Sequence, residues 1–201
     1  MRYVWLLFLW LPAGAQVSIG VSPLGILAEG AAGVSVGYQW KRWEIWTEPV
    51  VLLPGWHSVG GYQTVSGFRD ILQVRRFIGR RGHYFIGAEL RFKYQSSSNY
   101  MAVVTNLNGD TLPNYTYTIF NNQVGGAVFI GQRINFGRSP IFVEMNVGPG
   151  IKYNWASQPT YPAGYSRIYT DQNVDDPFPD KSISEWLPYL SFAVRFGLIL
   201  R

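Results

Sequence analysis

The chain has 201 residues, with 17 basic and 12 acidic side chains and a net charge of +5. Charged residues make up 14% of it, against about 25% in an ordinary soluble domain, which is too little charge to solvate a whole exterior. No stretch approaches the roughly 20 apolar residues of a membrane-spanning helix, and the lack of cysteine excludes disulfides, a lipoprotein anchor and thiolate metal sites.

The N-terminal segment has the pattern of a signal peptide. Arg2 supplies a positive charge, residues 3–11 form an apolar core, and Ala13-Gly14-Ala15 offers small residues at a cleavage site. We therefore expect residues 1–15 to be removed and residues 16–201 to form one domain. An exported chain without cysteine suits the envelope of a Gram-negative cell.

Alternating apolar and polar residues recur in eight segments after this leader. A period of two is typical of β-strands whose two faces have different surroundings. In the clearest segment, 83–95, Leu90 and Phe92 alternate with Glu89 and Arg91. The predicted strands are 17–28, 32–41, 43–53, 67–78, 83–95, 116–134, 141–155 and 187–200.

The links between these strands alternate between tight turns and longer loops. Short periplasmic turns and long external loops are typical of outer-membrane barrels. An open sheet in hydrocarbon would leave the backbone N–H and C=O groups of its edge strands unpaired, so such a sheet must close into a barrel. We therefore predict an all-β fold, an eight-stranded antiparallel up-and-down transmembrane β-barrel. The tight turns are 41–42, 79–82 and 137–140, and the long loops are 54–66, 96–115 and 156–186.

Strand parity places nine charged side chains on the inward face of this barrel. Unpaired charge in a narrow interior of low dielectric constant is costly, so we expect the four acids and five bases to pair and plug the lumen. A gated narrow pore or a proton path is the alternative. The predicted inward charges are Glu44, Glu48, Arg75, Glu89, Arg91, Lys93, Glu144, Lys152 and Arg195.

Other charges are expected outside the lumen. Asp70 and Arg76 share the parity of the apolar Leu72 and Val74, which predicts that they lie near the membrane interfaces. The basic residues of the short links, among them Arg133, are expected to contact anionic lipid head groups rather than nucleic acid.

Aromatic residues gather at both ends of the predicted strands. Two such bands are typical of the interfacial girdles of membrane barrels, where amphipathic rings sit at head-group level. The predicted interfacial aromatics are Trp40, Trp43, Tyr84 and Phe136 beside the tight turns, and Tyr94, Tyr153, Trp155 and Tyr189 beside the long loops.

Repeated glycine–aromatic segments run through the strands, as in Gly33-Val-Ser-Val-Gly-Tyr and Gly148-Pro-Gly-Ile-Lys-Tyr. With Gly87-Ala-Glu-Leu-Arg-Phe-Lys-Tyr and the final Phe192-Ala-Val-Arg-Phe-Gly-Leu-Ile-Leu, they make nearly all of the mature chain resemble small eight-stranded outer-membrane barrels of the OmpA/OmpX-like type. The resemblance implies the barrel fold and no catalytic residues. The chain ends in Arg201, whereas such families often end in an aromatic residue.

Two further groups of residues could carry chemistry. His57-Ser58 could belong to a lipid A-modifying enzyme, but catalysis needs a base oriented toward the hydroxyl, and no carboxylate lies nearby in the sequence. The acidic run in the last loop could bind Ca²⁺ or bridge to lipopolysaccharide, yet it lacks calcium-loop spacing, so we expect a solvated loop and no metal or cofactor. Its members are Asp171, Asp175, Asp176, Asp180 and Glu185.

The sequence thus predicts a non-enzymatic, monomeric outer-membrane protein that acts in envelope integrity or in loop-mediated binding. The expected partners are outer-membrane lipid, lipopolysaccharide, the barrel-assembly machinery, and an external protein or glycan at the tyrosine-rich loops. The alternatives are a lipid A-modifying enzyme, a narrow transporter, and a soluble lipocalin-like barrel with its apolar face inside.

Overall fold

A computed structural model of the chain describes residues 15–23, 31–53, 64–79, 83–137, 139–157, 162–167 and 183–200. This part of the molecule is all-β. No helix in it is long and apolar enough to cross a membrane. The strands are β1 (Ala15–Val21), β2 (Ala31–Trp40), β3 (Trp43–Thr47), β4 (Val50–Leu52), β5 (Thr64–Ile78), β6 (Tyr84–Asn106), β7 (Thr111–Asn135), β8 (Ile141–Ala156), β9 (Tyr165–Arg167) and β10 (Ile183–Leu200).

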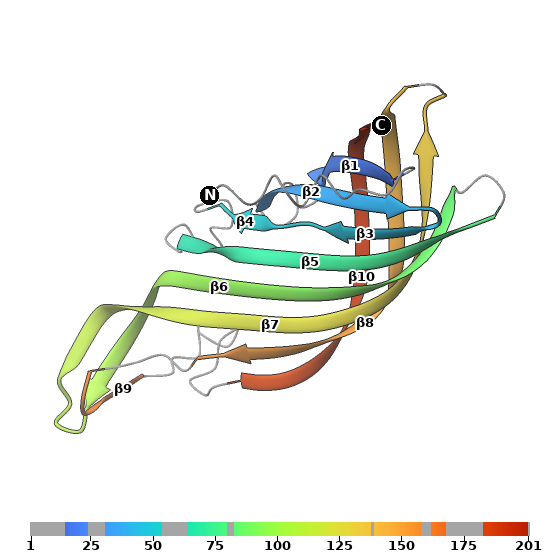
Figure 1. Cartoon of the computed structure of the whole chain (residues 1–201). Helices are drawn as coiled ribbons and strands as arrows, with labels where there is room; N and C mark the ends of the chain where they lie inside the picture. Colours follow the sequence, from blue (N-terminus) through green and yellow to red (C-terminus); the bar gives the residue numbers. More distant parts are fainter. Residues whose placement is uncertain are drawn as a thin grey trace, which may run out of the picture.

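The strands pair in an antiparallel ring that closes on itself. From β2 the sheet continues through β3 and β4 to β5, then to β6, β7, β8 and β10. β1 pairs with both β2 and β10 and so joins the two ends. In Figure 1, β8 and β10 curve away from β7 and lead back to β1. The all-β, antiparallel part of the prediction is therefore confirmed.

β3 and β4 lie in one line and are interrupted only at Glu48 and Pro49. Both keep the same register with β2 and with β5. Glu48 still exchanges two backbone hydrogen bonds with Ile71, at 2.9 and 3.3 Å. Pro49 has no N–H to donate, which accounts for the break without any change of register.

The pairing is offset by ten residues after one circuit of the ring. A path from Tyr189 of β10 through directly paired residues around the ring returns to β10 at Ile199, ten residues further along the chain. An even offset keeps every side chain on its own face, because side chains alternate with a period of two. The path runs through Gly150, Ala127, Glu89, Gln73, Trp46, Gly37 and Ser18.

The two faces of the ring have the reverse of a soluble protein's polarity. Outward-facing Leu190 and Ile130 are 68% and 64% exposed, whereas inward-facing Arg75 and Glu144 are 0% and 1% exposed. Charged residues are normally the most exposed and large aliphatic residues the most buried. A soluble lipocalin-like barrel was expected to have its apolar face inside, whereas the large apolar side chains lie on the outside of this ring.

Glycines on the inner face make room for aromatic rings from neighbouring strands. A Cβ atom on Gly37 would lie 2.2 Å from Cε3 of Trp46, and one on Gly131 would lie 2.2 Å from Cζ of Phe85. Because such contacts are far inside van der Waals distance, these positions accept no side chain while the rings stay in place.

The strands extend beyond their predicted ends at one side of the ring. β6 and β7 continue through most of residues 96–115, predicted to be a loop, and leave only 107–110 as a turn. β9 pairs with the end of β6, within the predicted loop 156–186, and β10 starts at Ile183 rather than at 187. An apolar cluster holds this extension together; its members are Val104, Tyr117, Ile119 and Ala156.

Candidate functional site in the charged interior

Five charged side chains from five strands meet inside the ring and form what we call the central cluster. Strand register brings them together, because Glu44 lies opposite Arg75, and Glu144 lies between Arg133 and Arg195 on its two neighbouring strands. All five side chains are buried. Strand pairing alone places these opposite charges beside one another, so their attraction does not depend on how the loops fold.

Glu144 is the centre of this cluster. Its Oε1 accepts hydrogen bonds from Nη1 of Arg75 at 2.6 Å and from Nη1 of Arg195 at 3.3 Å. Its Oε2 accepts from Nε and Nη2 of Arg133 at 3.0 and 2.8 Å. One carboxylate therefore holds three guanidinium groups, and its loss would leave three buried cations without their shared anion.

Glu44 connects opposite walls of the ring. Nη2 of Arg133 donates to both oxygens of Glu44, at 3.0 and 2.8 Å, although β7 and β3 are not neighbouring strands. Nη1 of Arg75 lies 3.3 Å from Oε2 of Glu44, and Oγ of Ser18 donates to Oε1 at 3.1 Å. Contacts of this length across the interior mean that side chains fill it here.

Aromatic rings surround the guanidinium groups of the central cluster. The Cζ atom of Arg75 lies 4.5 Å from the ring centroid of Trp46, and that of Arg133 lies 4.6 Å from the ring of Phe142. Arginine favours such stacked positions, and cation–π attraction offsets part of the cost of removing a guanidinium from water. The rings and ion pairs together make a layer of buried side chains near the tight-turn end.

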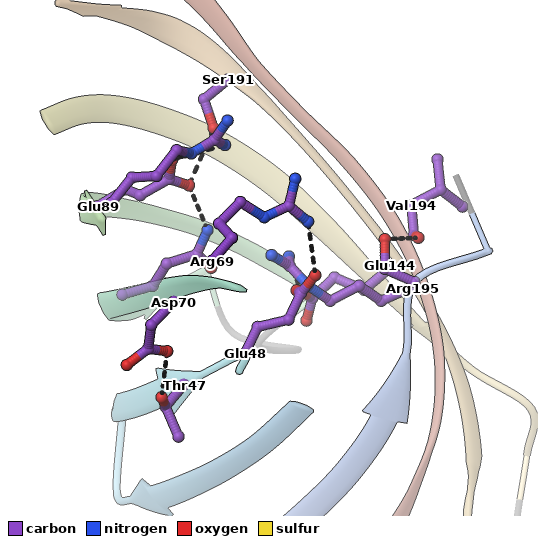
Figure 2. Close-up of polar contacts among 12 residues, drawn as sticks. Thr47, Glu48, Arg69, Asp70, Glu89, Glu144, Ser191, Val194 and Arg195 are labelled. Carbon is purple, nitrogen blue, oxygen red and sulfur yellow. Dashed lines mark hydrogen bonds and ion pairs between the residues drawn. The ribbon is translucent and has the colours of Figure 1, made fainter. Parts of the chain in front are cut away.

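A second group around Glu89, the Glu89 cluster, lies next to the central one. Glu89 accepts hydrogen bonds from Nε2 of Gln73 at 2.7 Å and from Oγ of Ser191 at 3.0 Å, as Figure 2 shows for Ser191. Nη2 of Arg91 lies 2.9 Å from Oε1 of Glu89. Gln73 also accepts a bond from Arg75 at 2.9 Å and so joins the two clusters.

Glu48 forms a third contact between distant strands. Its Oε2 accepts a hydrogen bond from Nε of Arg195 at 2.7 Å, and its Oε1 lies 3.8 Å from Nη2 of Arg69 (Figure 2). Lys93 and Lys152, also predicted to face inward, are half-buried. Lys152 forms no ion pair with any residue that the structure describes.

Sequence reasoning missed two arginines of the interior. Arg133 was expected in a tight turn near lipid head groups, but it is buried in the central cluster because it shares the inward parity of Phe129. Arg69, omitted from the prediction, shares the parity of Arg75 and is buried as well. Strand parity was the signal that could have found both.

The aromatic residues divide between the two ends of the ring, with one exception. Tyr189 was predicted to be interfacial but lies inside, where its hydroxyl is 3.4 Å from Glu89 and its ring is 5.0 Å from Cζ of Arg91. Its parity with Ser191 explains this placement. Trp40, Trp43, Tyr84 and Phe136 are exposed near the tight turns, and Tyr94, Tyr153 and Trp155 are half-buried near the other end.

The remaining predicted chemistry falls mainly on other parts of the chain. His57, Ser58 and the acidic run from Asp171 to Asp180 lie outside the described residues, as do residues 1–14 of the expected signal peptide. Among the described residues, no three His, Asp or Glu side chains are placed to hold a metal ion. Asp70 and Arg76, predicted to point outward, are both exposed.

No protein-family model, curated protein or solved structure matches this chain. The ring itself therefore carries the functional evidence, because its interior holds ion-paired side chains and its outer face is apolar.

Proposed function

We propose that the chain is an eight-stranded transmembrane β-barrel of the outer membrane of a Gram-negative bacterium, monomeric and synthesised with a signal peptide at residues 1–15. The observation that carries this proposal is the reversed polarity of the ring, with buried ion pairs inside and large apolar side chains outside. Soluble monomers rarely expose contiguous apolar surface of this extent. Hydrocarbon is the solvent that such an exterior matches.

The strand arrangement supports the count of eight. Because β3 and β4 share one line and one register, they count as a single strand, and the ring then consists of β1, β2, β3 with β4, β5, β6, β7, β8 and β10. An even number of strands is usual for such barrels. An eight-stranded barrel is just wide enough for side chains to fill its interior.

The filled interior leads us to propose a structural or interactive role rather than transport. Ion pairs cross the interior from Glu44 of β3 to Arg133 of β7 and from Arg195 of β10 to Glu48, and these contacts support a plugged lumen. Purified protein in planar bilayers should therefore show little or no conductance. Stable, ion-selective channels would contradict the plugged lumen and favour a transporter.

Insertion into the outer membrane has a direct test. The protein should be extracted from the envelope fraction by detergent and should migrate on gels at different positions with and without boiling, because a closed barrel resists unfolding by detergent alone. Recovery in the soluble fraction, with one mobility under both conditions, would contradict the proposal.

The extended hairpin favours loop-mediated binding as the role of the external face. Its tip is an ordered turn: Oδ1 of Asn106 accepts hydrogen bonds from the backbone N–H of Asn108 at 3.0 Å and of Asp110 at 2.8 Å. Leu107, between Asn106 and Asn108, is 102% exposed. A rigid turn that displays an apolar side chain is suited to contact with an external protein, because little ordering remains to be done on binding.

Single introduced cysteines can show which end of the ring faces the cell exterior, because the chain has no cysteine of its own. A Leu107→Cys variant should react with a membrane-impermeant maleimide on intact cells. The matched Arg42→Cys variant, in a tight turn at the other end, should react only after lysis. Labelling in the opposite order would invert the proposed topology.

A further inference from the structure

A groove runs across the outer face of the ring, on the surface that the proposed function places in lipid. It encloses about 820 Å³, which is within the range of about 300–1,000 Å³ that is usual for small-molecule sites. Among the described residues that line it, Arg76 alone carries a charge. The apolar part of its lining includes Trp43, Ala88, Val128 and Leu190.

The groove owes its depth to small side chains and to a break in the sheet. Ala88 stands in a row with the larger Val74 and Val128. The β7–β8 ladder is interrupted where Val128 faces Pro149, which has no N–H to donate. A short side chain beside an interrupted ladder leaves a hollow that neighbouring residues do not fill.

One wall of the groove climbs from the rim of the ring toward its middle. Trp43 follows the tight turn at 41–42 directly, whereas Val147 lies six residues after the start of β8 at Ile141. The wall therefore begins at the level of the turns and ends deep in the apolar band. Its members, each directly opposite the next, are Trp43, Arg76, Ile86, Ile130 and Val147.

The charged end of the groove lies at this rim. Arg76 is exposed, and its Cζ atom lies 5.6 Å from the ring centroid of Trp43. A guanidinium held against an indole ring at head-group depth can bind a phosphate through two parallel hydrogen bonds. The same long side chain can keep its charge in the polar layer while its stem covers apolar surface.

We propose that this groove binds one anionic phospholipid, with its phosphate on Arg76 and an acyl chain along the groove toward Leu190. The proposal rests on the proposed function, because only a membrane-embedded ring meets such a lipid. Arg76 complements the phosphate in charge, and the apolar lining complements the chain. The direction of the groove, from rim to middle, matches the direction in which a lipid of the turn-side leaflet lies.

Native mass spectrometry of the detergent-extracted protein, titrated with phosphatidylglycerol, tests the site. The unaltered protein should retain one tightly bound lipid. Arg76→Gln should weaken binding about tenfold, as the loss of a charge-assisted hydrogen bond does, and Ala88→Phe should abolish it because the ring fills the groove. Asp70→Asn, which changes the other outward charge of β5, should bind like the unaltered protein.

Three results would overturn the assignment. These are unchanged retention by Arg76→Gln, equally tight binding of uncharged diacylglycerol, and displacement of the phospholipid by lipopolysaccharide at lower concentration. Gel mobility with and without boiling, measured on every variant, separates the two proposals. If all variants insert and yet bind lipid equally, the groove assignment alone is wrong, whereas failure of the unaltered protein to insert contradicts the proposed function.

Discussion

The central cluster and the Glu89 cluster lie side by side in one interior but differ in their access to water. Glu144 holds three arginines that are all buried. Glu89 forms an ion pair with Arg91, whose side chain is 20% exposed. Ion pairs of the same kind are therefore fully buried in the central cluster and partly exposed in the Glu89 cluster.

The largest expected effect is that of Glu144→Ala. It leaves three buried guanidinium groups without their common acceptor, and breaking a buried ion pair in this way costs about 3–5 kcal/mol. Urea unfolding in detergent micelles, followed by tryptophan fluorescence, measures the change. Glu185→Ala, at an exposed glutamate of β10, serves as the control and should leave the midpoint in place. Equal midpoints for both variants would mean that the central cluster contributes nothing to stability.

The next largest effect is expected at the glycine beside Trp46. Gly37→Leu forces the indole ring out of its position among the arginines, and overpacking of this kind costs about 1–3 kcal/mol. The same unfolding assay applies. Gly126→Ala is the matched control, because a Cβ atom there approaches no described atom closer than 3.3 Å. An unchanged unfolding midpoint for Gly37→Leu would show that Trp46 can move without disturbing the central cluster.

A smaller effect is expected from Glu89→Ala. It removes acceptors for Gln73 and Ser191, but Arg91 keeps access to water, so we expect a loss of about 1–2 kcal/mol, near the value for an unsatisfied neutral group. The unfolding midpoint of this variant should fall between those of Glu144→Ala and Glu185→Ala. A loss as large as that of Glu144→Ala would remove the distinction between the two clusters.

The smallest effect on global stability is expected at the hairpin tip. Asn106→Ala removes the side chain that accepts from Asn108 and Asp110, yet the turn lies beyond the ring, so the unfolding midpoint should change by less than about 0.5 kcal/mol. Limited proteolysis should instead become faster at residues 107–110. An unchanged cleavage rate would show that the turn is held by the extension alone.

The sequence predicted the alternation well because each strand has one apolar face. It placed Glu44, Glu144 and Arg195 on one face, where the structure also has them, and it placed Leu190 and Val128 on the other. It did not predict which charges meet, because the contact of Arg133 with Glu44 depends on ring closure between residues that are 89 positions apart. Strand parity determines which face of the sheet a side chain occupies, but it does not determine which side chain it contacts across the interior.

Strand ends were harder to predict than strand faces. Residues 96–115 were predicted to form a long loop, but β6 continues through the polar run Ser96-Ser97-Ser98-Asn99. Pairing with β7 and the apolar cluster around Ile119 stabilise strand structure there, and neither is visible in the local composition. Tyr189 was misplaced for a related reason, since its proximity to a loop was given more weight than its parity with Ser191.

The ten-residue offset of the closed ring restricts how this gene can change in length. One amino acid added within a strand would reverse the faces of the following part of that strand, sending carboxylates to the outer face and leucines among the arginines. Two residues added together would keep each side chain on its own face and would change only the register with the neighbouring strands. We therefore expect odd-numbered insertions to survive only in the connecting segments, so the chain's history of insertions and deletions should record where the strands of the ring end.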